Sequence, residues 1–390
     1  MLKRLSKGEG LSREVKMKVD PGPGSGVNPD VIIIGAGVIG TACAYFLSRR
    51  SLKVLILERR HLCAGASGAS AALIMDGAAG MIHDPVERLK HESHQLLLEI
   101  EPDFEQSIER IHGGSMLIAD SEAAAGELKQ AYSDPGSGFR FLDGGQARRM
   151  EPMLGPRVTA AAYKSVNFHV SPFRLCKAYL DAAMRRGARI EYGVEVCGIG
   201  QDNGRPGVVA TNRGEFRADW VVVAGGAHTP EILSGIGCNL PIQPARGQVI
   251  ITEACPRMTD RILFFPDHLY IKQTAAGNFY IGSHTEYVGF VDRITLDKVT
   301  TYIRVLADTV PLLSRLRAVR FFSGFRPLSR DELPIIGPVP ECPQLIVASG
   351  HGRSGMMLSA GTGKSVSELI VDGAATLPMD AFAVDRFRTP

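Results

Sequence analysis

The sequence lacks a long hydrophobic run, since no apolar stretch reaches the roughly 18 residues that would cross a bilayer. Strong charge of one sign is also missing: the formal net charge is +3, so we expect no nucleic-acid partner. The 390 residues are enough for two domains, and a composition with 45% hydrophobic and 22% charged residues is ordinary for a globular protein. The absences therefore exclude a transmembrane segment and leave a folded protein of two domains.

Cysteine pairs with the spacing of a metal site are also missing. The seven cysteines are scattered, and no two of them form a C-x-x-C motif. We therefore expect no zinc or iron–sulfur site within this chain and predict no bound metal. Several cysteines lie in apolar runs, which predicts buried free thiols and favours a reducing, cytoplasmic compartment. The seven are Cys43, Cys63, Cys176, Cys197, Cys238, Cys255 and Cys342.

The first 29 residues contain no apolar core of the kind that a signal peptide carries. They are polar and basic, and residues 21–26 consist only of Pro, Gly and Ser. This composition predicts a disordered tail. A basic docking arm for an acidic partner is the alternative.

A glycine-rich turn after a buried strand organises the rest of the chain. Val31–Ile34 is a run of four β-branched residues that predicts a parallel strand, and Gly35, Gly37 and Gly40 then complete a G-x-G-x-x-G motif. Gly35 allows a tight turn, Gly37 lets the backbone approach a pyrophosphate, and Gly40 lets the next helix pack closely. That helix, predicted over 38–51, directs its first N–H groups at the phosphates of a dinucleotide.

The second predicted strand, over 53–57, supplies the acidic residue that this motif requires. The strand ends in Glu58, where a carboxylate accepts both hydroxyls of an adenosine ribose. The following residues, 64–72, are all Ala, Gly or Ser. Their small side chains leave room for a flat or phosphate-bearing ligand, to which the hydroxyls of Ser67 and Ser70 can donate. These motifs predict a dinucleotide and leave FAD and NAD both open.

The middle of the chain alternates predicted helices and strands. Helices are predicted over 84–112, with Pro102 as a break or kink, and over 171–186. Strands are predicted over 188–196 and 218–227. From 244 to 330 the pattern turns antiparallel, with strands over 248–252, 269–274, 278–283 and 318–325 and a helix over 296–306.

The end of the chain returns to the opening pattern, with a predicted strand over 344–349, a glycine loop over 350–355 and a helix up to residue 372. Within this helix, Gly361–Ser365 looks like part of a P-loop. Leu358 stands where that motif requires glycine, and the stretch does not follow a strand, so we predict no nucleoside triphosphatase.

The predicted fold class is α/β, with a Rossmann-like cofactor-binding domain on a parallel sheet and an inserted α+β substrate domain built on an antiparallel sheet. The predicted cofactor domain is discontinuous and comprises 30–80, 167–240 and 333–376. The predicted substrate domain comprises 81–166 and 241–332. The tail over 1–29 and an extension over 377–390 complete the chain.

Six motifs in this order resemble the glycine oxidase / D-amino-acid oxidase family of flavoenzymes, over about residues 30–372. They are the opening Gly35–Gly40, Gly65–Gly68, Val223–Ala227, Arg246–Gln248, Gly324–Pro327 with Pro334–Gly337, and Gly350–Gly355. Within the family, Glu286–Phe290 and Ile335–Pro338 resemble catalytic subunits of heteromeric dehydrogenases such as hydrogen cyanide synthase, opine oxidase and D-hydroxyproline dehydrogenase.

The resemblance implies FAD rather than NAD, held between the two domains. It also implies noncovalent FAD, because relatives with covalent flavin use a cysteine near 324–330 and this chain has none there. The strand expected to end at Val196 would offer backbone groups to the adenine, and the loop after residue 349 would lie along the flavin. The implied cofactor-binding residues are Gly35, Gly37, Val38, Ile39, Gly40, Glu58, Arg59, Ala66, Ser67, Ser70, Ala71, Val196, Ala224, Gly225, Gly350, His351, Gly352, Arg353, Ser354, Gly355 and Met356.

The resemblance further implies a carboxylate-bearing amine as substrate, oxidised by hydride transfer from Cα to flavin N5. Arg326 would pair with the substrate carboxylate, Tyr270 would supply a hydroxyl near it, and Arg353 would lie beside flavin and substrate. The chemistry agrees, because a planar guanidinium binds a carboxylate bidentately and thereby orients Cα. No acid–base residue is named, because a neutral substrate amine needs none. Many relatives carry an aromatic residue or Asn beside the loop arginine, where this chain has Gly352 and Ser354.

Two further functions stay open. The chain could be the flavin-bearing subunit of a heteromeric dehydrogenase, passing electrons to partner subunits that hold an Fe–S cluster or a second flavin. An NAD-dependent dehydrogenase is the third hypothesis, and it fails if the purified protein is yellow.

Overall fold

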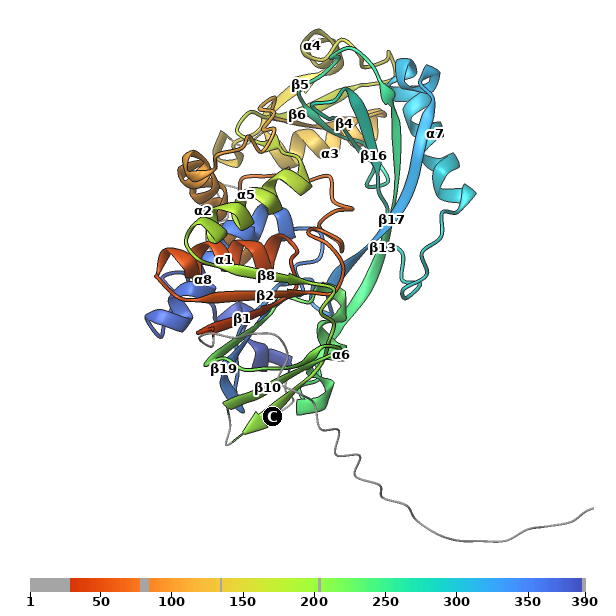
Figure 1. Ribbon diagram of the computed structural model, residues 1–390. Coiled ribbons are helices and arrows are strands. Elements are labelled where there is room, and N and C mark those ends of the chain that lie inside the picture. Colours follow the sequence, from red (N-terminus) through yellow and green to blue (C-terminus); the bar gives the residue numbers. More distant parts are fainter. Residues whose placement is uncertain (1–28, 78–83, 134, 203–204, 388–390) are drawn as a thin grey trace, which may run out of the picture.

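The computed structural model describes residues 29–77, 84–133, 135–202 and 205–387. Two large sheets organise this part of the chain, one of six strands and one of eight (Figure 1). The tail predicted over 1–29 lies outside the described residues, except for its last residue. Within the described part, no helix combines the length and the apolar character that crossing a membrane requires.

The six-stranded sheet is the predicted parallel sheet, in the order β18-β19-β12-β1-β2-β8. Neighbours from β19 to β8 pair in parallel, whereas β18 joins the edge antiparallel to β19. The register sets Ile34 beside both Val223 and Leu57, so the glycine-rich turns after these strands meet at one edge. The strands are β1 (Val31–Ile34), β2 (Val54–Glu58), β8 (Arg189–Tyr192), β12 (Trp220–Val223), β18 (Ile335–Val339) and β19 (Cys342–Ser349).

Three helices cover one face of this sheet: α1 (Val38–Arg49), α5 (Pro172–Arg185) and α8 (Gly355–Val371) (Figure 1). Alternation along β1 decides which side chains meet them, because successive residues point to opposite faces. Val31 and Ile33 pack against the helices, whereas Ile32 and Ile34 belong to the hydrophobic cluster on the other face.

A small antiparallel sheet covers the other face, in the order β11-β10-β9. Its strands are β9 (Val196–Asp202), β10 (Arg205–Thr211) and β11 (Gly214–Phe216). The predicted bounds of the strand over 188–196 are therefore wrong. β8 ends at Tyr192, and Val196 is the first residue of β9 instead of the last residue of a strand. Gly193, with φ +69°, breaks the run between them.

The eight-stranded sheet has the order β17-β13-β16-β15-β14-β4-β6-β5. It is antiparallel as predicted, except that β14 pairs in parallel with β4. One face packs on α7 (Leu296–Thr309) and α4 (Gly144–Met150). The strands are β4 (Ser115–Ala119), β5 (Arg140–Asp143), β6 (Ala160–Lys164), β13 (Ile242–Ala254), β14 (Ile262–Phe264), β15 (Tyr270–Gln273), β16 (Asn278–Gly282) and β17 (Ala318–Ser329).

The helix predicted over 84–112 is shorter than expected. Asp84 caps α2 (Pro85–Ile100) by accepting from the N–H groups of Val86 and Glu87, as the sequence pattern indicates. The helix then ends before Pro102, whose ring removes a backbone donor, and a 3₁₀ turn follows. The remaining elements are α3 (Glu122–Tyr132), α6 (Thr229–Leu233) and the two-stranded sheet of β3 (Leu73–Ile74) and β7 (Phe168–His169).

The P-loop-like glycines lie inside α8, where they serve helix packing. A Cβ on Gly361 would lie 2.7 Å from a methyl carbon of Leu89 in α2. A Cβ on Gly363 would lie 2.8 Å from the backbone of Ala42 in α1. The two glycines therefore let α8 approach both neighbouring helices closely.

All strands of the six-stranded sheet come from 30–80, 167–240 and 333–376, and all strands of the eight-stranded sheet come from 81–166 and 241–332. The domain boundaries themselves stay a prediction. The segment after residue 376 packs on the body, since Phe382 and Val384 are buried and Arg386 forms an ion pair with Asp331 at 2.8 Å.

Candidate active site

A cavity of about 1230 Å³ lies between the two sheets. It exceeds the 300–1,000 Å³ of an ordinary ligand pocket, so it has room for an extended cofactor together with a small substrate. Its walls come from the turns after β1, β2, β12 and β19 and from one face of the eight-stranded sheet.

The β1–α1 turn forms one end of the cavity. Gly35 has φ +104°, and a Cβ on it would lie 2.7 Å from the carbonyl oxygen of Ala224, so a side chain there is excluded. Gly37 faces the cavity, and a Cβ on it would meet only the hydroxyl of Ser67, at 3.1 Å. Val38 and Ile39, in the first turn of α1, also line the cavity. This arrangement leaves the cradle that a pyrophosphate needs.

Gly40 does not line the cavity, although we expected it among the cofactor-binding residues. A Cβ there would lie 2.0 Å from the carbonyl oxygen of Gly35. Its role is therefore the close packing of α1 on the turn.

Glu58 lies at the cavity wall with an exposed fraction of 8%. One carboxylate oxygen accepts from the backbone N–H of Ala36 and the other from that of Arg60, both at 2.8 Å. These bonds fix the carboxylate beside the glycine turn, and each oxygen keeps a lone pair for a ribose hydroxyl. Arg59 and Val196 line the same end of the cavity.

The loop rich in Ala, Gly and Ser runs from this end to the eight-stranded sheet. Ser67 accepts from the N–H of Val38 at 3.0 Å, and Ser70 accepts from the N–H of Ala72 at 3.0 Å. The loop touches the sheet at Ala69, whose carbonyl accepts from the Tyr280 hydroxyl. Ala66, Ser67, Ser70 and Ala71 all line the cavity.

The loop from Gly350 to Gly355 approaches the cavity from β19. Gly350 and Gly352 have φ +72° and +52°, and the N–H of Gly352 donates to Pro327 of β17 at 2.8 Å. Burial lowers the pKa of His351 to about 3, so this side chain is neutral, and Nε2 lies 3.1 Å from the Thr362 hydroxyl. The cavity is lined by His351, Gly352, Arg353, Gly355 and Met356, and by Ala224 and Gly225 after β12, but not by Gly350 or Ser354.

Arg326 lies on β17 with its guanidinium above Gly247 of the neighbouring strand. A Cβ on Gly247 would lie 2.6 Å from Nη2 of Arg326, so only glycine leaves this space. Nη1 donates to the carbonyl of His284 at 3.0 Å, and Nη2 donates to the hydroxyl of Ser283. The guanidinium is thus held against uncharged oxygens.

Arg353 converges on the same place from the other sheet. Its Nη2 donates to the hydroxyl of Thr285 at 2.8 Å, and Nη1 of Arg326 lies 3.4 Å from the same oxygen. Within the described part of the chain, neither arginine forms an ion pair. Two positive charges that share one hydroxyl and face a cavity form an anion-binding arrangement.

Tyr270 of β15 completes the cluster expected from the sequence. Its ring stacks on Tyr280, with ring centres 6.1 Å apart and planes 9° apart, and lies 6.0 Å from the ring of Phe264. Tyr270 is half-buried and lines the cavity. The structure therefore brings Arg326, Arg353 and Tyr270 to one cavity.

A buried ion pair holds the segment that carries Ser283 and Thr285. Arg246 binds Glu286 through two N···O contacts of 3.0 and 3.2 Å, and Gln248 donates to the same carboxylate at 2.8 Å. Burial alone would raise the pKa of Glu286, but the hydrogen bonds and charge of Arg246 and the bond from Gln248 outweigh it, so the pKa lies below its usual value.

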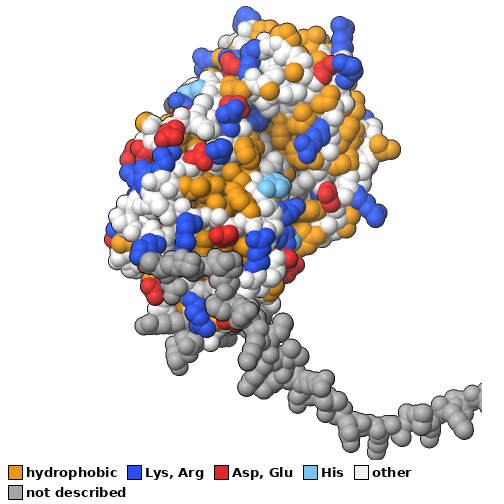
Figure 2. Space-filling view, viewed as in Figure 1, with side chains coloured by type: hydrophobic (Ala, Val, Ile, Leu, Met, Phe, Trp, Pro, Cys, Tyr) orange, Lys and Arg blue, Asp and Glu red, His pale blue; other side chains and the backbone are white. Residues whose placement is uncertain are grey.

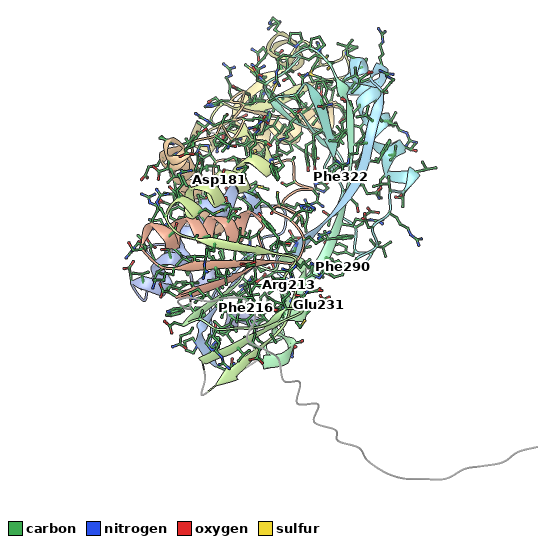
Figure 3. The ribbon with its side chains drawn as sticks, viewed as in Figure 1. Asp181, Arg213, Phe216, Glu231, Phe290 and Phe322 are labelled. Atoms are coloured by element: carbon green, nitrogen blue, oxygen red, sulfur yellow. The ribbon has the colours of Figure 1, made fainter. Side chains whose placement is uncertain are left out.

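Phe290, further along this segment, also lines the cavity. Its ring stacks on His228, with centres 4.4 Å apart, and lies edge-on to Phe325. In Figure 3 the labelled Phe290 lies between Phe322 of β17 and Glu231 of α6. Phe290 thus connects the two sides of the cavity.

Sequence reasoning missed the residues that hold the arginines, namely Gly247, Ser283 and Thr285. The available signal was position, because Ser283 ends a predicted strand and Thr285 lies just after it, where functional side chains commonly lie. Arg326 is 43 positions from Ser283 and 41 from Thr285, and Arg353 is 68 positions from Thr285, so only the fold makes these residues neighbours. Within the described residues, no group of three or more His, Cys, Asp or Glu is placed to hold a metal ion.

Comparisons with known proteins agree with this geometry. A family model described as FAD dependent oxidoreductase (DAO) matches residues 30–369. The chain is 30% identical to hydrogen cyanide synthase subunit HcnC of Pseudomonas aeruginosa, over 92% of this chain and 96% of that protein. It is 29% identical to the glycine oxidase of Geobacillus kaustophilus, over 92% and 97%. The crystal structure of that oxidase superposes with a TM-score of 0.85, over 92% of this chain and 99% of the other.

Proposed function

The chain belongs to the DAO family of FAD-dependent oxidoreductases, and from that premise we propose that it oxidises a carboxylate-bearing amine: an amino acid, an imino acid or an opine. The resemblance seen in the sequence motifs is thereby confirmed at the level of family, fold and cofactor. The observation that carries the substrate class is the pair Arg326 and Arg353, which share the Thr285 hydroxyl and have no acidic partner in the described part of the chain.

The chain's own residues then orient the substrate. Arg326 binds the carboxylate bidentately, replacing its contacts with Ser283 and His284, and β17 pairing keeps its backbone rigid. Arg353 adds a second positive charge, and Tyr270 supplies a hydroxyl from the neighbouring part of the sheet. When bound, FAD supplies the oxidising chemistry by accepting the hydride from Cα.

In this proposal the cofactor lies along the cavity wall already described. Gly35, Gly37 and the first turn of α1 hold the pyrophosphate, and Glu58 holds the ribose. Val196 lies at the adenine end, as the first residue of β9. FAD is held without a covalent bond in this proposal, because neither β17 nor the loop over 350–355 contains a cysteine.

Anaerobic reduction of the bound flavin tests the proposal. The purified yellow protein is mixed without oxygen with glycine, sarcosine, D-amino acids, D-hydroxyproline and opines, and flavin absorbance is followed. We expect at least one of these amines to bleach the flavin. Substitution Arg326→Ala should lower kcat/KM for that amine about 100-fold or more, because a charged hydrogen-bonded pair is lost.

The matched control is Arg304→Ala, an exposed arginine on α7. It removes the same charge and should leave the reduction rate within about twofold of the parent. Unchanged reduction in the Arg326 variant would contradict the carboxylate clamp. A panel that leaves the flavin oxidised would contradict the substrate class.

A second function follows from an exposed apolar surface on the substrate side, part of which Figure 2 shows in orange. Most of the exposed large apolar side chains in the described part of the chain fall between residues 287 and 321, and Phe290 and Phe321 also line the cavity. They are Tyr287, Val288, Phe290, Val291, Leu296, Ile303, Leu312, Val319 and Phe321. Apolar surface of this kind favours a protein partner.

The partner in this second proposal is an electron-accepting subunit that carries an Fe–S cluster or another flavin, which would make the chain the flavoprotein subunit of a heteromeric dehydrogenase. Co-purification of such a chain, lost with Val319→Glu, would support it. Fast turnover of the isolated chain with oxygen alone would contradict it. We also propose a cytoplasmic location, supported by seven free cysteines.

A further inference from the structure

The face of the eight-stranded sheet that lines the cavity also carries a buried cation, Lys272. Lys272 and Tyr270 are two positions apart on β15, so both side chains point to the cavity, about 7 Å apart along the strand. The register pairs Tyr270 with Gly282 and Lys272 with Tyr280. Ser283, which holds the guanidinium of Arg326, follows Gly282. Arg326, Tyr270 and Lys272 therefore follow one another along the sheet, with Tyr270 in the middle.

Lys272 has more hydrogen-bonding capacity than its surroundings use. The side chain is 3% exposed, and Nζ donates to the carbonyl of Val170 at 2.8 Å. An ammonium group has three donors, and no other partner of Nζ exists within the described residues. Burial lowers the pKa of Lys272 to about 7, although the charge of Glu109 opposes this. Glu109 itself is bound to Arg174 at 2.6 Å.

His169, next to Val170 in the chain, lies at the same part of the cavity. Its side chain is 1% exposed, it lines the cavity, and Nε2 has no hydrogen-bond partner. Burial, with a smaller contribution from Lys272, lowers the pKa of His169 to about 2, so the ring is neutral. A buried polar nitrogen without a partner is costly unless a ligand or water satisfies it.

A purely structural role for Lys272, as a clamp between β15 and the segment before α5, accounts for one of its three N–H groups. It does not account for the unpaired nitrogen of His169. A ligand with acceptor oxygens at this place would satisfy both side chains and would compensate the buried charge.

We propose that Lys272 and His169 form a second anion subsite, which binds a distal carboxylate of the substrate while Arg326 binds the first. The inference rests on the proposed function, because it takes Arg326 as the site of the first carboxylate. The favoured substrates are then amines with two carboxylates, one on each side of the reacting carbon and nitrogen.

Titration of the holoenzyme with simple acids tests the subsite without any turnover. The probes are succinate, glutarate, adipate and pimelate, each paired with the monocarboxylate of the same carbon number, and binding is read from the flavin absorbance spectrum. One diacid length should bind about 10- to 100-fold more tightly than its monocarboxylate. Equal or weaker binding of every diacid would overturn the inference.

The variant Lys272→Met keeps the length of the side chain and removes its charge. We expect the ratio of the two dissociation constants, diacid against monocarboxylate, to fall to about one. The control Lys129→Met removes an exposed charge on α3 and should keep the parent ratio. A parent-like ratio in Lys272→Met overturns the inference. If that variant does not retain FAD, the comparison of chain lengths in the parent protein decides.

The two proposals fail in different ways. If diacids bind more tightly but no amine reduces the flavin, the subsite stays supported and the proposed reaction is overturned. If monocarboxylic amines reduce the flavin but diacids do not bind more tightly, the reaction stays supported and the subsite is overturned.

Discussion

Gly37 and Gly40 belong to the same motif at the cofactor end of the cavity, but the lack of a side chain serves a different purpose at each. A Cβ on Gly40 would lie 2.0 Å from the carbonyl oxygen of Gly35, inside the packed turn. A Cβ on Gly37 would point into the cavity and meet only the flexible hydroxyl of Ser67. The motif therefore combines one glycine that the fold needs and one that the ligand needs.

Substituting each of these glycines by alanine should separate stability from FAD affinity. Gly40→Ala should lower the free energy of unfolding by about 1–3 kcal/mol or more, because the backbone must move. Gly37→Ala should fold like the parent, as residue 37 has φ −76°, but should bind FAD more weakly. Urea unfolding of the FAD-free proteins and quenching of FAD fluorescence measure the two quantities. Equal losses of stability in both variants would contradict this division.

Thr285 is the residue on which the two substrate arginines meet. Its hydroxyl accepts from Arg353 at 2.8 Å and lies 3.4 Å from Arg326. Thr285→Val keeps the shape and removes this shared acceptor, so we expect KM for the substrate to rise about tenfold. The control Thr285→Ser keeps the hydroxyl and should restore KM. A rise in KM of the same size in the serine variant would show that the methyl group matters instead.

The substrate arginines could be named from the sequence, whereas the residues around them could not. Arg326 and Arg353 stand in motifs that resemble a known family, and that resemblance implied their roles. Ser283, Thr285 and Lys272, in contrast, do not belong to any of these motifs. These residues matter because strand pairing places them beside the arginines or Tyr270, and the register of a sheet is not written in any local pattern.

At the scale of elements, the hydrophobic pattern of the sequence predicted where strands and helices lie. It did not predict where some of them end. Apolar and β-branched residues continue through 188–196, so the pattern predicts one strand. β8 stops at Tyr192, where its neighbour β2 also stops at Glu58 and where Gly193, with φ +69°, redirects the chain. The glycine is visible in the sequence, but the end of the neighbouring strand that fixes this boundary is not.

Substituting a glycine of α8 by alanine tests whether the glycines of this helix serve packing, and the same substitution in α3 is the control. Gly363→Ala places a methyl group 2.8 Å from the backbone of α1, and overpacking of this kind costs about 1–3 kcal/mol. This should outweigh the gain of up to about 1 kcal/mol that alanine brings to a helix. Gly126 of α3 is exposed and has no atom within 4 Å of such a methyl group, so Gly126→Ala should be stabilising.

Chemical unfolding of both glycine variants measures these opposite signs. A stabilised Gly363→Ala variant would mean that α1 and α8 can move apart at little cost. A destabilised Gly126→Ala variant would mean that higher helix propensity does not stabilise the interior of α3.

At the scale of the whole molecule, the site exists because two sheets face each other across one cavity. The glycine turns lie at the carboxyl edge of the six-stranded sheet, and the arginine, tyrosine and lysine side chains point from one face of the other sheet. The resemblance implied a cofactor between two domains. The order of the eight strands, however, follows from pairings between residues that are far apart in the chain, which no motif specified.

Buried histidines make the stability of the whole molecule depend on pH. Burial lowers the pKa of His351 to about 3 and that of His169 to about 2, whereas the ordinary value is 6.5. Below pH 6.5 the unfolded chain therefore binds protons that the folded chain does not bind, so the free energy of unfolding falls as the pH falls. Each histidine should contribute a loss of about 2 kcal/mol between pH 7 and pH 5.

The variant His351→Gln isolates one of these contributions. Glutamine can still hydrogen-bond to the Thr362 hydroxyl but does not titrate, so the loss of stability between pH 7 and pH 5 should be smaller by about 2 kcal/mol than in the parent. Urea unfolding at both pH values measures it. His112→Gln, at an exposed histidine, should keep the parent's pH dependence. If His351→Gln also keeps that dependence, protonation of His351 does not oppose folding, and the acid sensitivity must come from other groups.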